Sequence, residues 1–245
     1  MRYRLNAYDP TNNHFQTILE FDFQPSYFTL QKDVIAVAET IASSREGIVH
    51  FFDLNGNEKK VIKFGSDVVN ITNNGNDIII YCVGCLYGVD IDTLEQRTLV
   101  QRENTEFVYV NDNTYSYCSI EAEELEKEIP QVHSGIIDNS RNTELFGLDN
   151  AIIDYYDDEN IYTTALENKV KYRIYDWNGN LVDEIIPSET LGVSDGALPI
   201  AYHEMDYSSI VRVWNGQLIA YHFNKSEIEL LSCSLETHAC EFLKS

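Results

Sequence analysis

Short apolar runs recur along the whole chain, and turns rich in Asn, Gly and Asp separate them. Runs that alternate with polar residues, or stay briefly continuous, are typical of half-buried or fully buried antiparallel strands. Such runs predict five hairpins, at 27–30 with 34–38, 68–72 with 78–82, 107–110 with 115–120, 152–156 with 161–165, and 210–214 with 218–223. With the hairpins described next, the pattern predicts about 22 strands and almost no helix.

The turns between these hairpins repeat. Asn-Gly, a strong hairpin signal because both positions tolerate positive φ, occurs at 55–56, 74–75, 178–179 and 215–216. At 53–57 and 176–180 it belongs to matching phrases, in which an apolar strand ends in Asp and Asn-Gly-Asn follows. Weaker relatives of this Asp turn begin at Asp9, Asp90 and Asp138, and the most degraded lies at 233–237. The spacing of 37 to 58 residues is near that of four-stranded propeller blades.

The predicted fold is therefore an all-β β-propeller of four-stranded antiparallel blades, forming a single domain over residues 1–245. The sequence predicts six hairpins with an Asp turn but only five partner hairpins to complete four-stranded blades. The blades can therefore be arranged in two ways. We prefer six blades, with one shared between the termini, because that closure removes free sheet edges. Five blades with an extra N-terminal hairpin are the alternative. Two stretches interrupt the repeat: residues 121–130 predict a short helical insertion ended by Pro130, and residues 187–206 predict a long inter-strand loop.

The chain resembles bacterial β-propellers whose blades carry an Asp-x-x-x-Gly-like turn, as at Asp53, Asp90 and Asp176. This resemblance covers most of the chain and implies the fold. The Gly-His and Trp-Asp pairs of WD40 blades, the double glycines of kelch repeats and the Asp box of sialidases are absent from the sequence. The resemblance therefore implies no site residue.

Charge narrows the choice of partner. Seventeen Lys and Arg against 40 Asp and Glu give a net charge of −23, which repels nucleic acid and anionic membranes and attracts basic proteins. Solubility alone is the alternative explanation. The sequence shows no secretory signal after Met1, and its five scattered cysteines do not resemble a disulfide framework, so we expect a cytoplasmic location with reduced thiols.

Candidate chemistry is sparse. Cys82 and Cys85 form a Cys-x-x-Cys pair, for which Cys233, His238 and Cys240 could complete a zinc site, or which could be redox-active. The remoteness of the second set and the strand context favour a packing role, so we expect no metal and no cofactor. The Asp turns lack the Glu of a calcium loop, since Phe64 and Pro187 occupy its place. The histidines are isolated, as at His50 and His222, and no nucleophile elbow or phosphate loop occurs.

Two acidic clusters remain as candidate partner-binding sites, and we expect both on exposed loops. They comprise Glu121, Glu123, Glu124, Glu126 and Glu128, and then Asp154, Tyr155, Tyr156, Asp157, Asp158 and Glu159. Carboxylates would steer a basic protein, and tyrosines would supply contact area at low entropic cost. A solvated loop is the alternative.

These features favour a cytoplasmic protein-binding module over an enzyme, monomeric apart from its partner. An immunity or antitoxin-type protein that masks a basic partner would fit the charge and size. The alternative is a propeller-type hydrolase or lyase with carboxylates in the central funnel, which needs two carboxylates facing each other.

Overall fold

The computed structural model describes residues 2–9, 14–39, 46–103, 105–120, 131–165, 170–191, 210–224 and 227–243. The chain divides into two compact units, Met1–Phe107 and Val108–Ser245, called here the first unit and the second unit.

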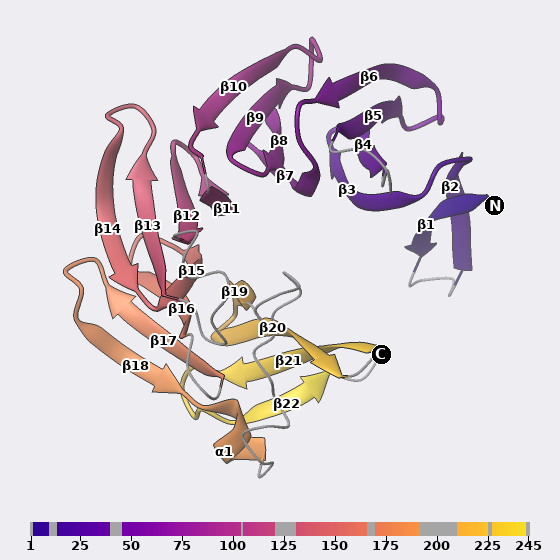
Figure 1. The fold of residues 1–245 in the computed structure, drawn as a ribbon. Helices are drawn as coiled ribbons and strands as arrows, with labels where there is room; N and C mark the ends of the chain where they lie inside the picture. The colour runs from indigo at the N-terminus through magenta and orange to yellow at the C-terminus, as the bar shows by residue number, and fades with distance from the viewer. Residues whose placement is uncertain are drawn as a thin grey trace. The chain divides into compact units, whose positions relative to one another are not determined.

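The first unit contains one two-stranded and two four-stranded antiparallel sheets (Figure 1). The two-stranded sheet consists of β1 (Tyr3–Asp9) and β2 (His14–Phe21). The next sheet has the order β3 (Pro25–Gln31), β4 (Val34–Glu39), β5 (Gly47–Asp53), β6 (Glu58–Phe64). The third has the order β7 (Val68–Asn74), β8 (Asp77–Cys82), β9 (Cys85–Asp90), β10 (Gln96–Gln101).

The second unit contains three further four-stranded sheets of the same topology, the first of which begins just before the unit boundary. The first has the order β11 (Thr105–Asn111), β12 (Thr114–Ile120), β13 (Val132–Asp138), β14 (Thr143–Asp149). The second has the order β15 (Ala151–Tyr156), β16 (Asn160–Ala165), β17 (Lys171–Asp176), β18 (Leu181–Ile185). The third has the order β19 (Ile210–Trp214), β20 (Gln217–Asn224), β21 (Glu227–Ser234), β22 (Cys240–Leu243). One short helix, α1 (Pro187–Leu191), follows β18.

The predicted hairpins are confirmed over the described residues. Six outer pairs each follow the Asp-turn pattern or its degraded form, and five inner pairs accompany them, giving 22 strands. Within the described part of the chain, β1 and β2 pair only with each other, and the C-terminal sheet is complete without them. Helix α1 occupies the start of the stretch predicted as a loop at 187–206; the rest of that stretch, and the predicted helical insertion at 121–130, lie outside the described residues.

Continuous apolar runs form β4 and β8, the second strands of their sheets, which lie between two partners and are buried on both faces. In β8, Ile78, Ile79 and Ile80 are all buried. In β4, Val34, Ala36 and Ala38 pack in one core cluster with Ile78 and Ile80, while Ile35 and Val37 enter a second cluster on the opposite face. Burial on both faces is the reason these strands are apolar at every position and not at alternate ones.

The Asp turns have a common hydrogen-bond geometry that explains the repeat. One Asp53 carboxylate oxygen accepts hydrogen bonds from the backbone amides of Asn55 (3.0 Å) and Asn57 (2.9 Å), and Asp176 does the same with Asn178 (2.9 Å) and Asn180 (2.8 Å). Asp90, Asp138 and Asp157 bind turn amides in the same way, and the Ser234 hydroxyl replaces the carboxylate in the last sheet. Such Asx turns hold the chain reversal by local bonds alone.

Candidate partner-binding surface

The structure describes one of the two predicted acidic clusters. Glu121, Glu123, Glu124, Glu126 and Glu128 lie outside the described residues. The other cluster begins in the second half of β15 and continues through the turn to β16.

The expectation that the whole second cluster lies on an exposed loop is wrong for two of its members. Asp154 is only 4% exposed and Tyr156 only 2% exposed, because β15 continues to Tyr156. Asp154 is the extra residue of a β-bulge, because the register of Cα pairs passes from Ile153 with Thr163 directly to Tyr155 with Tyr162. The bulge turns its side chain inward, where it accepts a hydrogen bond from Thr164 Oγ1 at 2.6 Å.

Tyr156 has a structural role. Its hydroxyl is hydrogen-bonded to the Thr114 hydroxyl at 2.9 Å, and its ring makes edge contacts with Tyr109 and Trp177 at centroid distances of 5.1 and 5.9 Å. Burial raises the pKa of the Tyr156 phenol, so it stays a neutral hydrogen-bonding group. A buried ring of this kind cannot be a contact residue for a partner.

The turn itself carries the accessible carboxylates. Asp157 is half-buried, and one of its carboxylate oxygens accepts hydrogen bonds from the backbone amides of Glu159 (2.9 Å) and Asn160 (2.8 Å). The backbone carbonyl of Asp157 accepts a hydrogen bond from Trp177 Nε1 at 3.0 Å. These bonds fix the turn, and Asp158 and Glu159 project from it as exposed side chains.

Aromatic side chains support this turn. Tyr155 lies 4.9 Å from Tyr109 and 5.7 Å from Tyr162, measured between ring centroids. The pKa of Tyr109 is raised to about 12, mainly by burial and to a smaller extent by the neighbouring Tyr155. The pKa of Tyr162 is also raised to about 12, mainly by burial and to a smaller extent by the Asp157 carboxylate. Both phenols therefore stay neutral at physiological pH.

We call Asp157, Asp158, Glu159, Tyr155 and Trp177 the acidic-aromatic surface. Both aromatic side chains in it are half-buried, a state in which a side chain is held in place yet keeps an accessible face. Sequence reasoning had assigned Tyr155 and missed Trp177. The available signal was its place in the Asp turn at 176–180, directly after Asp176.

A polar cluster on β12–β14 was also missed. The Glu144 carboxylate accepts a hydrogen bond from the Tyr117 hydroxyl (2.5 Å) and lies 3.4 Å from His133 Nε2, while His133 Nδ1 lies 2.9 Å from Asp149. Asp149, and then Glu144, raise the pKa of His133. Each of these side chains makes an ion pair or hydrogen bond within the sheet, so we interpret the cluster as a set of cross-strand pairs that stabilise the sheet.

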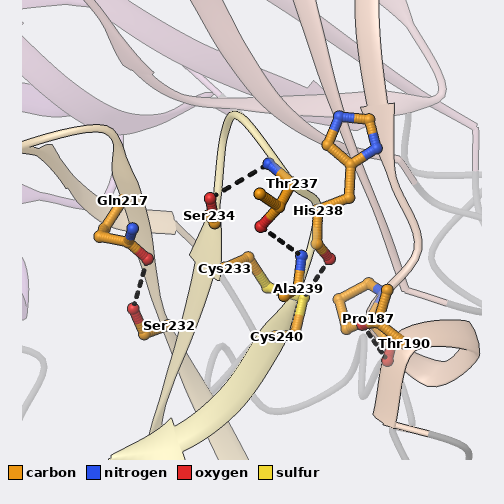
Figure 2. Close-up of a disulfide and its surroundings, with 10 residues drawn as sticks. All are labelled: Pro187, Thr190, Gln217, Ser232, Cys233, Ser234, Thr237, His238, Ala239 and Cys240. Carbon is orange, nitrogen blue, oxygen red and sulfur yellow. Dashed lines mark hydrogen bonds between the residues drawn. A yellow bond between two sulfur atoms is a disulfide. The ribbon is translucent and has the colours of Figure 1, made fainter.

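The cysteines differ from expectation at the C-terminal end. Cys233 and Cys240, opposite each other on β21 and β22, form a disulfide (Figure 2). The expectation of five reduced cysteines is therefore wrong for this pair, and neither sulfur can serve as a zinc thiolate. His238, between them in sequence, places Nε2 2.8 Å from the Asp183 carboxylate. The cytoplasmic location stays a prediction.

Cys82 and Cys85 face each other across the β8–β9 turn as free, buried thiols. Burial raises the pKa of Cys82 to about 12, and Cys85 donates a hydrogen bond to the Val100 carbonyl at 3.3 Å. A thiol that stays protonated is a poor metal ligand and a poor nucleophile. Over the described residues no three His, Cys, Asp or Glu side chains converge in a way that could hold a metal ion.

The predicted strand histidine His50 is paired on both sides. Its Nε2 lies 3.1 Å from Glu39 and its Nδ1 2.9 Å from Glu58, and the Phe23 ring stacks on it at 4.2 Å. His222 falls in β20, but its side chain lies outside the described part of the structure. Within the described ranges, no helix is long and apolar enough to cross a membrane.

Comparisons with known proteins identify the fold. No protein-family model matches the sequence, and none of the curated proteins matches it. A chain of the mitotic checkpoint complex is similar with a TM-score of 0.61 and 11% identity, over 99% of this chain and 72% of that one. A chain of Kuenenia stuttgartiensis hydrazine synthase gives a TM-score of 0.61 and 14% identity, over 94% and 70%. A chain of the complex of KlAtg21 with the coiled coil of AgAtg16 gives a TM-score of 0.53 and 13% identity, over 94% of this chain and 89% of that one. Identities this low show the fold alone: the chain is an all-β protein with the β-propeller fold of four-stranded antiparallel sheets.

Proposed function

We propose that this chain is a protein-binding module that docks a basic partner on the acidic-aromatic surface. The observation that carries the proposal is the turn at 157–159, where two exposed carboxylates project from a reversal that is fixed by hydrogen bonds and backed by aromatic rings. A fixed turn loses little conformational entropy on binding, so its side chains are already placed for a partner.

Charge supports a basic partner over other classes. The second unit, which carries this surface, has 25 Asp and Glu against eight Lys and Arg. A field of this sign raises the association rate of a cationic protein and repels nucleic acid. The similarity to a propeller solved in complex with a coiled coil is consistent with a binding role, although that partner belongs to the other protein.

An immunity or antitoxin-type role is the specific form of this proposal. Masking a basic enzyme requires a rigid acidic surface, and the acidic-aromatic surface is the candidate for this contact. Adding the purified chain to such an enzyme should abolish its activity at a one-to-one ratio.

Association kinetics test the docking surface. A partner is captured from the native host and its binding measured by stopped flow at 20 and 150 mM NaCl. The association rate of the wild-type chain should fall at least tenfold between these salts, and the Asp158→Asn/Glu159→Gln variant should associate several-fold more slowly at low salt. Trp177→Ala should instead raise the dissociation rate, since aromatic anchors hold a formed complex.

The matched control is Glu236→Gln/Glu241→Gln, which removes the same charge from exposed positions of the second unit away from the turn. It should change the association rate by less than twofold. Association that is insensitive to salt, or equal slowing in both double variants, would contradict a role for the acidic-aromatic surface and leave its charge to solubility.

A further inference from the structure

We propose that the disulfide between Cys233 and Cys240 is a redox-sensitive latch, which a dithiol reductant opens to release the hairpin β21–β22 from the sheet that precedes it. The latch lies on other residues than the acidic-aromatic surface, and the proposal does not depend on the function proposed above.

The turn between β21 and β22 has weaker local contacts than the Asp turns at 53–57 and 176–180. In those turns a carboxylate oxygen accepts two backbone amides, whereas here the neutral Ser234 hydroxyl accepts the amide of Thr237 at 3.2 Å. Hydrogen bonds to a charged acceptor are the stronger kind. His238 also adopts a φ of +57°, a left-handed conformation that costs free energy in any residue but glycine. Local contacts therefore favour this turn less than they favour the other two.

The disulfide supplies what the turn lacks. Cys233 and Cys240 lie opposite each other on β21 and β22 and directly flank the turn (Figure 2). β22 is the last strand in the order of its sheet and, with four residues, the shortest strand that the structure describes. Because so short a strand forms few ladder hydrogen bonds, a covalent link at its first residue contributes much of what holds it in place.

The same hairpin contacts the preceding sheet of the second unit and the helix that follows it. His238 Nε2 lies 2.8 Å from the Asp183 carboxylate of β18. Helix α1 lies against β22, and its Leu191 packs on the core cluster that contains Cys233. Since His238 lies between the two cysteines, breaking the disulfide frees the turn that places the imidazole beside Asp183. We therefore expect reduction to loosen the turn, β22 and the contact of β22 with α1.

Exposure decides which sulfur is attacked. Cys240 is half-buried, whereas Cys233 is 0% exposed in an apolar cluster with Tyr172, Leu218 and Leu231. A thiolate of the reductant therefore attacks Cys240 Sγ and forms a mixed disulfide there. The bond between the two cysteines breaks, and Cys233 leaves as a thiolate that takes up a proton.

The position of the leaving thiol requires the reductant to be a dithiol. Cys233 stays opposite Cys240 in the sheet, at a high effective concentration, so it readily attacks the mixed disulfide and restores the original bond. The second thiol of a dithiol is intramolecular as well. It attacks the reductant's own sulfur, closes the reductant's disulfide and releases Cys240 as a thiolate, which is protonated. The dithiol is oxidised by two electrons, the two cysteines become thiols, and the protons of the dithiol balance theirs.

Hydrogen exchange of the full chain, measured by mass spectrometry with and without dithiothreitol, tests the proposal. We expect reduction to speed exchange about tenfold in residues 234–243, through local opening. Exchange in α1 should also become faster, and that in β13 and β16 should not change. At an equal thiol concentration, the monothiol 2-mercaptoethanol should reduce the bond far more slowly than dithiothreitol. Reoxidation should restore slow exchange.

The wild-type chain in its two redox states carries this test, and two cysteine variants support it. Cys233→Ser/Cys240→Ser should exchange fast in residues 234–243 without reductant and should not respond to dithiothreitol. Cys118→Ser is the matched control, because it removes a buried thiol outside the disulfide; it should keep the full response.

Four results would each overturn the proposal. They are five free thiols in the untreated chain, equal exchange in the oxidised and reduced chains, acceleration that spreads to β13 and β16, and equally fast reduction by the monothiol. In the third case the bond would hold the whole unit and not one hairpin. Asp158→Asn/Glu159→Gln should leave the response to dithiothreitol unchanged, so the latch and the acidic-aromatic surface can fail separately.

Discussion

At the scale of single residues, the local environment lowers the pKa of the turn aspartates and raises the pKa of the buried Cys82 thiol. Turn amides and neighbouring side chains stabilise the ionised form of Asp53, Asp90 and Asp176, and hydrogen bonds lower the pKa of each carboxyl. Burial penalises the ionised form of Cys82 and raises its pKa to about 12. Hydrogen bonding decides the first case and desolvation the second.

Asp176→Ala should lower the urea midpoint of unfolding at pH 7. Hydrogen bonds from the Asn180 side chain and the turn amides depress the pKa of Asp176 in the folded chain below the ordinary 3.8. A depressed folded-state pKa gives stability that is present above pH 3.8 and lost as the pH falls through the folded value. The gap between wild type and variant should therefore narrow between pH 4 and pH 2. The exposed Asp158→Ala serves as control, and a gap that stays constant over this range would refute the explanation.

Thiol titration should find three reactive cysteines after denaturation without reductant, and five after reduction. Cys82, Cys85 and Cys118 are buried thiols outside any disulfide, whereas Cys233 and Cys240 are joined by one. In the native chain the three thiols should react with a disulfide reagent far more slowly than a free cysteine at pH 8, because they are buried and Cys82 stays protonated. Five thiols before reduction would show that the disulfide does not form.

At the scale of elements, turns of two to five residues allow short antiparallel strands to follow one another closely along the chain. Gly56 and Gly179 both adopt φ of +84° in matching Asp turns, a conformation that strains any other residue. They differ in surroundings: a Cβ at Gly56 would lie 3.2 Å from Leu19 Cδ2, whereas at Gly179 the nearest atom, of Phe146, is at 4.0 Å.

Gly179→Ala should lower the free energy of unfolding by roughly 1–2 kcal/mol, the cost of the left-handed conformation. Gly56→Ala should cost more, because Leu19 must also move. Gly65→Ala is the control, since a Cβ there meets nothing within 4 Å and its φ is not left-handed. Urea unfolding followed by circular dichroism measures all three. Equal losses at Gly56 and Gly65 would contradict this account.

At the scale of the whole molecule, charge is unevenly distributed. The first unit has 15 acidic and nine basic residues, and the second has 25 and eight. Repulsion between like charges destabilises a compact state, and salt screens it. Because the second unit has the larger excess of acidic residues, we expect this repulsion to destabilise mainly the second unit.

Raising NaCl from 10 to 150 mM should therefore slow hydrogen exchange more in strands of the second unit than in those of the first. The buried strands β8 and β16 are suitable reporters, one from each unit. Equal slowing in both would show that local ion pairs outweigh the net charge.

The sequence by itself determined the strand pattern, the six outer and five inner hairpins and the Asp turns, because alternation, Asn-Gly and Asx bonding act over a few neighbouring residues. It also placed the acidic turn at 157–159. Only the tertiary structure decided that the bulge at Asp154 and the packing of Tyr156 withdraw both side chains from solvent. The same holds for the pairing of Cys233 with Cys240 and for the support that Trp177 gives the turn. These features depend on strand register and on contacts between segments distant in sequence, which residue order does not reveal.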